Sequence, residues 1–218
     1  MTRGMIFDMD GVLFDSHPVH RKAWCEVLHD LGKAVSDEEL DFILDGPTRD
    51  QILQHFFGAL PQGQILSYVQ KKDLLFRREE ENLRIVDGVQ SFLETAEAAG
   101  IPRVIATSAS KTRAERMLRR YGLIHRFAAV ITGDDVSNGK SDPTIFLRSA
   151  RQIGAEPSEV IVFEDAPSAI RVATSIGMKC VGVGDRGRRS ELERAGARLV
   201  VSDFTQLSIP TIARILQQ

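Results

Sequence analysis

The sequence predicts an α/β fold: a parallel sheet core flanked by helices, with an α-helical cap domain inserted near the N-terminus. Short apolar runs rich in β-branched residues recur along the chain, and helical segments lie between them. Such alternation is typical of a parallel sheet with right-handed crossovers. The exception is the stretch 16–83, which shows only helical patterns and is much longer than one crossover requires.

The first predicted strand covers residues 5–7, and the helical insert follows it after a short turn. A helix is predicted over residues 18–31, because Pro18 stands in its first turn. Ser36 and Glu39 have the spacing of a capping box, which predicts the start of a second helix. Two further helices are predicted over residues 48–57 and 62–82.

The other predicted strands are short, apolar and bounded by turn residues, as is typical of strands buried on both faces. They cover residues 104–106, 128–131, 160–163, 180–183 and 199–201. Because both parts of the chain contribute strands to one sheet, we expect residues 1–15 and 84–218 to form the α/β core together. Residues 16–83 would then form the helical cap.

The charge and the cysteine content argue against several classes of protein. The chain has 28 Lys and Arg residues against 30 Asp and Glu residues, and this balance gives no long-range attraction to nucleic acid or to an anionic membrane. The two cysteines, Cys25 and Cys180, do not make a disulfide framework. No apolar stretch approaches the length of about 20 residues that spans a bilayer. We therefore expect a cytoplasmic monomer that acts on a small molecule, with no nucleic-acid or membrane partner.

Reactive side chains stand just past several predicted strands, at the edge of the sheet where ligands bind in open α/β folds. They are Asp8 and Asp10 after the first strand, Thr107 and Ser108 after the second, Lys140 between the third and the fourth, and Glu164 and Asp165 after the fourth. Carboxylates packed this closely repel one another unless a cation lies between them. They are hard oxygen ligands of the kind that holds Mg²⁺.

This set of groups suits phosphoryl transfer from a small phosphate ester. Lys140 and Ser108 would supply a positive charge and a hydrogen-bond donor for the phosphate oxygens, and neutralising the transferring group is most of the catalytic task. A carboxylate can itself be the nucleophile, through an aspartyl-phosphate intermediate. We predict that Asp8 attacks phosphorus, and that Asp10 acts as general acid toward the leaving oxygen and then as general base toward water.

Four segments carry these residues. They are Phe7-Asp8-Met9-Asp10-Gly11-Val12-Leu13-Phe14-Asp15-Ser16, Ala106-Thr107-Ser108-Ala109-Ser110, Gly139-Lys140 and Val162-Phe163-Glu164-Asp165. In their order, and across almost the whole chain, they resemble the four motifs of the haloacid-dehalogenase superfamily phosphotransferases. The resemblance implies a Rossmann-like core with a helical cap inserted after the first motif, which agrees with the organisation described above.

The same resemblance implies a role for each motif residue. The implied roles are nucleophile for Asp8, acid and base for Asp10, phosphate ligands for Ser108, the Ala109 amide and Lys140, and Mg²⁺ ligands for Asp8, the Asp10 carbonyl and Asp165. Glu164 would either bind Mg²⁺ directly or support a metal ligand from behind. Ser108 could also cap the helix that follows it.

Residues of the predicted cap point to one branch of this superfamily. Similarity to the β-phosphoglucomutase-like group, which includes many small sugar phosphatases, rests on Asp15-Ser16, His20, Ala23-Trp24, Arg49 and Ser108-Ala109-Ser110-Lys111. His20, Arg49 and Lys72 are accordingly predicted to contact the substrate. The alternatives are plain packing for His20 and a cap-surface charge for Arg49.

Two other functions compete with that of a sugar-phosphate phosphatase. The first is a phosphosugar mutase of the β-phosphoglucomutase type. This chain has Asp45-Gly46 where that mutase has a lysine before a glycine, and an acidic residue facing a phosphate is unfavourable, so Asp45 favours the phosphatase. The second is a catalytically silent module that binds phosphometabolites. The intact set of motif residues argues against it, namely Asp8, Asp10, Ser108, Lys140 and Asp165.

Overall fold

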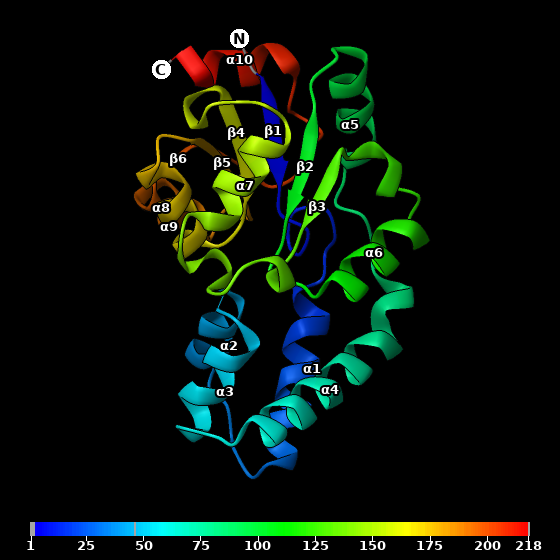
Figure 1. Ribbon diagram of the computed structural model, residues 1–218, viewed down its shortest axis with the longest axis vertical. Coiled ribbons are helices and arrows are strands. Elements are labelled where there is room, and N and C mark those ends of the chain that lie inside the picture. Colours follow the sequence, from blue (N-terminus) through cyan, green and yellow to red (C-terminus); the bar gives the residue numbers. More distant parts are fainter. Residues whose placement is uncertain (1–2, 46, 218) are drawn as a thin grey trace.

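The described chain forms a six-stranded parallel sheet, which confirms the predicted fold class. A computed structural model describes residues 3–45 and 47–217. The strands pair in the order β3-β2-β1-β4-β5-β6, and every pairing is parallel (Figure 1). Their bounds are β1 Gly4–Phe7, β2 Arg103–Ala106, β3 Ala129–Ile131, β4 Val160–Glu164, β5 Lys179–Val183 and β6 Ala197–Val201. Because β1 is central, the residues after it lie between the ends of β2 and β4.

Helices cover both faces of the sheet and make three layers. Buried side chains of α5, α6 and α10 belong to the hydrophobic cluster on one face, and those of α7, α8 and α9 belong to the cluster on the other. The bounds of these helices are α5 Val89–Ala98, α6 Lys111–Arg120, α7 Thr144–Gln152, α8 Pro167–Ser175, α9 Arg189–Ala195 and α10 Ile209–Gln217. The central strands β1, β2 and β4 are therefore buried at every residue, as their apolar sequences require, whereas the edge strands β3 and β6 are partly exposed.

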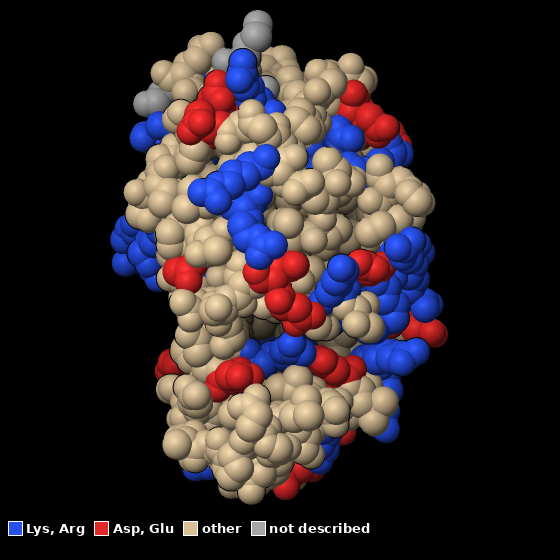
Figure 2. All heavy atoms as spheres, viewed as in Figure 1, with Lys and Arg blue, Asp and Glu red and all other residues tan. Residues whose placement is uncertain are grey.

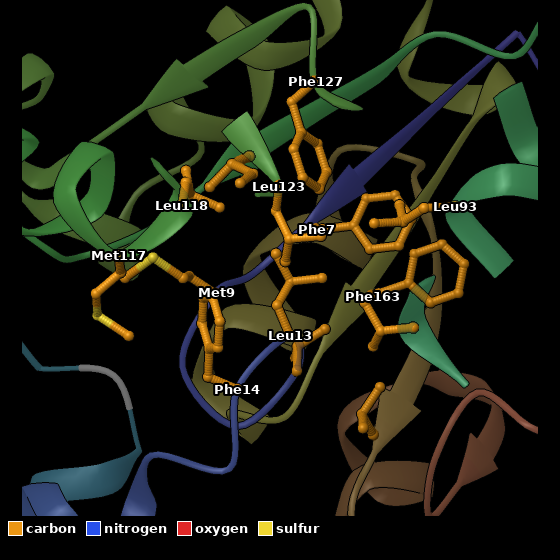
Figure 3. Packing of buried hydrophobic residues seen from close by; sticks show 14 of the residues in the cluster. Phe7, Met9, Leu13, Phe14, Leu93, Met117, Leu118, Leu123, Phe127 and Phe163 are labelled. Carbon is orange, nitrogen blue, oxygen red and sulfur yellow. The ribbon is translucent and has the colours of Figure 1, made fainter. Parts of the chain in front are cut away.

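Aromatic packing fixes the ends of the two central strands. Phe7 of β1 and Phe163 of β4 are register partners, and their rings stack with centroids 4.5 Å apart. Figure 3 shows both rings in one cluster with Leu93, Leu123 and Phe127. Burying such a side chain stabilises the fold by about 2–3 kcal/mol. Asp8 and Glu164 directly follow these two phenylalanines, so this packing holds their backbone in place.

The predicted cap contains four helices that share a small core of their own. They are α1 His17–Asp30, α2 Asp37–Leu44, α3 Arg49–Phe57 and α4 Gln62–Glu79, and they lie together beyond the carboxyl end of the sheet (Figure 1). Trp24, Leu28 and Leu53 are buried between them. The expected capping box is present, because Ser36 N–H donates to Glu39 Oε2 at 2.7 Å and Glu39 N–H donates to Ser36 Oγ at 3.3 Å.

The structure differs from the sequence prediction at the end of α4. The predicted helix 62–82 ends at Glu79 and continues as the 3₁₀ turn Glu80–Asn82, a tightening that is common at helix ends. Every helix in the described part of the chain, α4 included, is too short or too polar to cross a membrane.

The two connections to the predicted cap run side by side. Phe14 and Ile85 form an isolated antiparallel bridge. Next to it, Asp15 N–H donates to the carbonyl of Arg84 at 3.0 Å, and Val86 N–H donates to the carbonyl of Leu13, also at 3.0 Å. The chain therefore enters and leaves the helical insert through one paired segment of backbone.

Candidate active site

A pocket lies at the carboxyl ends of β1, β2 and β4, and residues of the predicted cap line it as well. All ten residues that the sequence named as site candidates are among its lining residues. They are Asp8, Asp10, His20, Arg49, Lys72, Ser108, Ala109, Lys140, Glu164 and Asp165. Figure 2 shows a hollow at this level of the molecule, with basic and acidic side chains around it.

Asp8 follows the central strand and contacts a buried lysine. Lys140 Nζ lies 2.6 Å from Asp8 Oδ1 and 2.7 Å from Glu164 Oε2, and all three side chains are buried. Burial raises the pKa of Asp8 to about 6, although Lys140 opposes that rise. Burial also disfavours the charge on Lys140, but Asp8 and Glu164 outweigh it and raise the lysine pKa above its usual value. Lys140 is therefore a permanent cation beside Asp8.

Three carboxylates form a buried cluster that could hold a metal ion. One oxygen from each of Asp8, Glu164 and Asp165 lies within 4.8 Å of the others. Glu164 Oε1 accepts hydrogen bonds from the backbone N–H groups of Asp165 and Ala166, at 3.1 and 3.2 Å. Asp165 Oδ2 is buried without a hydrogen-bond partner. His17 Nε2 is 2.8 Å from this oxygen, but the contact lacks hydrogen-bond angles. The donor set fits a hard cation, with Glu164 already engaged in supporting the loop.

Ser108 follows β2 and has an unused hydroxyl. Its Oγ is buried without a hydrogen-bond partner. The helix that follows, α6, is capped by Ser110, whose Oγ accepts a hydrogen bond from the backbone N–H of Arg113 at 3.4 Å. The idea that Ser108 caps this helix is therefore wrong, and its hydroxyl remains available to a ligand. The predicted amide donor beside it, Ala109 N–H, donates to Thr107 Oγ1 at 3.1 Å.

A close approach of backbone keeps the loop of Ser108 in place. Gly133 N–H donates to the carbonyl of Ala109 at 3.0 Å. A Cβ at Gly133 would lie only 2.7 Å from the carbonyl oxygen of Ser108. A larger residue at this position would push the Ser108 loop away, so glycine is required here.

Asp10 accepts hydrogen bonds from several donors. Ser16 Oγ donates to Asp10 Oδ1 at 2.7 Å, and His20 Nε2 lies 3.1 Å from the same oxygen. Arg113 Nη1 donates to Oδ1 at 3.0 Å, while its Nη2 donates to Oδ2. Burial disfavours the charge on Asp10, but Arg113 and His20 outweigh it and hold the pKa of Asp10 well below its usual value. Asp8 and Asp10 thus lie in opposite electrostatic environments.

Arg113 is a site residue that the sequence analysis missed. It stands in the first turn of α6, lines the pocket and is 8% exposed. A positive charge in the first turn of a helix is unfavourable to the helix dipole. Such a conflict between local preference and structure is expected at functional positions. An arginine in the first turn of the helix that follows the second motif is the sequence signal that could have found it.

The predicted substrate contacts His20, Arg49 and Lys72 are among the residues of the predicted cap that line the pocket. Lys72 Nζ lies 3.1 Å from His20 Nδ1, and because a lysine in its charged form only donates, Nδ1 accepts and Nε2–H faces Asp10. Burial and the neighbouring Lys72 lower the pKa of His20 to about 3, which keeps the ring neutral, and burial lowers the pKa of Lys72 to about 7. Arg49 Nη1 donates to Asp73 Oδ2 at 3.0 Å.

Asp45 is not among the residues that line the pocket. Its Oδ1 accepts a hydrogen bond from the backbone N–H of Ser168 at 3.1 Å, and its carbonyl oxygen accepts one from Ser168 Oγ. Ser168 stands in the first turn of α8, where N–H groups favour a carboxylate. The expectation that Asp45 opposes a phosphate is therefore wrong, because the helix end binds this carboxylate instead. Gly46 lies outside the described residues.

Most of the sequence matches a known family. Residues 5–183, a range that contains all four motifs, match the family described as haloacid dehalogenase-like hydrolase. The chain belongs to the haloacid dehalogenase-like hydrolases. The resemblance that the motifs suggested is confirmed.

Relatives of this haloacid dehalogenase-like hydrolase include phosphatases and a mutase. It is 33% identical over 186 residues to a fructose-1-phosphate phosphatase of Escherichia coli, covering 83% of this chain and 95% of that one. It is 29% identical over 218 residues to a validoxylamine A 7'-phosphate phosphatase of Streptomyces hygroscopicus subsp. limoneus, covering 97% and 99%. A β-phosphoglucomutase structure from Clostridium difficile superposes with a TM-score of 0.86 at 25% identity, covering 100% and 98%.

Proposed function

We propose that this enzyme is a Mg²⁺-dependent phosphatase that hydrolyses small phosphate monoesters, with sugar phosphates as the favoured class. The observation that carries the proposal is that Asp8, the candidate nucleophile, is buried in the same pocket as a hydroxyl group without a hydrogen-bond partner. Lys140 contacts Asp8 at 2.6 Å, and Ser108 Oγ has no hydrogen-bond partner in the same pocket. A phosphoryl group attacked by Asp8 would satisfy both Lys140 and Ser108. Two relatives named as phosphatases of phosphorylated sugars or sugar-like compounds support the substrate class.

The reaction divides into two displacements at phosphorus. An Asp8 oxygen forms a bond to phosphorus while the bond from phosphorus to the alkyl oxygen breaks. Asp10, which takes up a proton when the negatively charged ester binds next to it, gives that proton to the alkyl oxygen. Water then attacks the aspartyl phosphate, Asp10 takes the water proton, and the bond to Asp8 breaks to release inorganic phosphate. Mg²⁺ held by Asp8, Asp165 and the Asp10 carbonyl would neutralise charge on the phosphoryl group. Glu164 supports this set.

The helices of residues 16–83 would serve as a cap over the leaving group. His20, Arg49 and Lys72 come from this segment and line the pocket together with the catalytic aspartates. The paired connection at Phe14 and Ile85 offers a common hinge for its motion. A cap of this kind excludes water while the aspartyl phosphate forms.

Charge pairing inside the pocket favours the phosphatase over the mutase. A mutase must hold a second phosphate on the leaving-group side, which needs cations that are free to meet it. Among the described residues, Arg113 is paired with Asp10, and Arg49 and Lys72 lie 3.0 and 3.9 Å from the carboxylate of Asp73. Because these cations already lie near carboxylates, the pocket suits a neutral polyol as the leaving group.

One experiment separates the three candidate functions. The purified protein with Mg²⁺, β-glucose 1-phosphate and a trace of the 1,6-bisphosphate is followed by phosphorus NMR, beside a panel of sugar phosphates and phosphoglycolate. Inorganic phosphate that appears with the wild type, but not with Asp8→Asn or after chelation, supports the phosphatase. Glucose 6-phosphate with little free phosphate would establish the mutase. Binding of the esters without any turnover would establish the silent module.

A further inference from the structure

The Arg113 side chain joins the acid–base group to the predicted cap. Its guanidinium donates from two nitrogens to the two oxygens of Asp10. On another side, its Cζ atom lies 4.9 Å from the ring centroid of Phe76 in α4. The side chain is 9% exposed, so water does not compete freely for these contacts. A buried arginine between a carboxylate and an aromatic ring has little freedom to move.

The contacts on the two oxygens of Asp10 are unequal. Oδ1 accepts from Ser16 and Arg113, and it also faces His20. Oδ2 accepts from Arg113 alone among the described residues. Ser16 and His20 hold the carboxylate through one oxygen only, and a carboxylate held in that way can still rotate about its Cβ–Cγ bond. The planar fork of arginine fixes both oxygens at once.

We propose that Arg113 is the positioning residue of the acid–base step. It sets the plane of the Asp10 carboxylate and leaves one lone pair of Oδ2 open for the proton that passes to the leaving oxygen. The proposal rests on the proposed function, in which Asp10 is the acid. Its consequence is that Arg113 controls the part of the reaction that depends on the leaving group, and not the attack by Asp8.

The test compares esters that need the acid to different degrees. A sugar phosphate leaves as an alkoxide and requires a proton, whereas the 4-nitrophenolate of 4-nitrophenyl phosphate leaves without one. We expect Arg113→Met to lower kcat/KM about 10²-fold for the sugar phosphate that the wild type hydrolyses fastest, which is the usual contribution of general acid catalysis. The loss for 4-nitrophenyl phosphate should stay below about fivefold, since that ester needs little acid assistance. Arg113→Lys should not restore the sugar phosphate rate, because an ammonium group cannot span both oxygens.

A double-mutant cycle separates positioning from direct contact with the sugar. If Arg113 acts through Asp10, adding Arg113→Met to Asp10→Asn should cause no further loss. Additive losses would overturn the proposal in favour of direct substrate binding, and equal losses on both esters would overturn it in favour of a structural role. Because each ratio is taken on one preparation, partial unfolding cancels. Arg116→Met, which removes a neighbouring arginine that pairs with Glu80 instead, should leave the ratio unchanged.

The same data distinguish this inference from the proposed function. Hydrolysis of both esters by the wild type, lost in Asp8→Asn, supports the phosphatase whatever Arg113 does. If the wild type hydrolyses neither ester, the phosphatase fails first.

Discussion

The two sides of the pocket are built differently, although Asp8 and Asp10 are only two positions apart. On the phosphoryl side, Asp8 follows β1 and Glu164 is the last residue of β4, and the charged lysine between them contacts both. On the leaving-group side, Asp10 is surrounded by Ser16 and His20 from the start of α1 and by Arg113 from α6. Burial raises the pKa of Asp8 to about 6, whereas Arg113 and His20 outweigh burial and hold the pKa of Asp10 well below its usual value.

This difference shows that neighbours, rather than residue type, set the pKa values of two identical side chains. Asp8 shares one lysine with a second buried carboxylate, so its negative charge is costly unless a further cation lies next to it. Asp10 has an arginine fork of its own, so it is held in one orientation before any ligand binds. Substitutions can therefore change one side of the pocket at a time.

The largest effect is expected from Lys140→Met on the phosphoryl side. The substitution leaves Asp8 and Glu164 buried and unpaired, which should lower the free energy of unfolding by about 3 kcal/mol. Phosphatase activity should fall about 10²-fold or more, because a preorganised charge at the phosphoryl group is lost. Urea unfolding and phosphate release measure the two losses. Unchanged stability would mean that Lys140 does not hold the two carboxylates.

How far the sequence could predict the contacts of the site depends on how far apart the two contacting residues lie along the chain. Asp8 directly follows β1 and Glu164 ends β4, so the apolar pattern of these two strands was enough to predict that both carboxylates lie at the same edge of the sheet. Arg113 lies 103 positions from Asp10, and Ser168 lies 123 positions from Asp45. The sequence around a charged residue does not indicate which distant residue it will contact in the folded chain. The fold and the phosphoryl side were thus predictable, while the contacts of Arg113 and Asp45 were not.

A smaller effect, on binding rather than folding, is expected from Ser108→Ala. Its hydroxyl has no partner in the described chain, so removing it should cost little stability and should raise KM about 10-fold or more, the value of a hydrogen bond to a charged oxygen. Ser110→Ala is the matched control, because Ser110 caps α6. It should lower the free energy of unfolding by about 1 kcal/mol without a comparable change in KM. The reverse pattern would exchange the two roles.

A more modest change is expected where the predicted cap meets the core through Asp45. Asp45→Ala removes the carboxylate that accepts the Ser168 N–H, so KM should rise less than 10-fold while the product stays inorganic phosphate. Asp45→Lys should behave similarly or worse, because a cation opposes the helix N-terminus. Phosphorus NMR of the reaction follows both variants. Appearance of mutase product in Asp45→Lys would restore this residue to the phosphate site.

The last prediction concerns Lys72 on the leaving-group side, and its effect depends on pH. Burial lowers the pKa of Lys72 to about 7 in the folded chain, whereas an unfolded lysine titrates near about 10. Between these values the unfolded chain binds a proton that the folded chain does not, so the stability contributed by this residue rises with pH.

The free energy of unfolding of Lys72→Met should therefore compare most favourably with that of the wild type below about pH 7. That advantage should shrink by on the order of 1 kcal/mol per pH unit as the pH rises through 8 and 9, because the buried ammonium of the wild type loses its charge. Urea unfolding of both proteins at about pH 6.5, 8 and 9.5 measures how the difference in their free energies of unfolding changes with pH. Lys71→Met, which removes the neighbouring lysine that pairs with Asp30 at the surface, is the matched control. A difference for Lys72→Met that did not vary with pH would mean that Lys72 keeps its charge in the folded protein, and the leaving-group side would then carry one cation more than the pairing of Arg113 and Arg49 suggests.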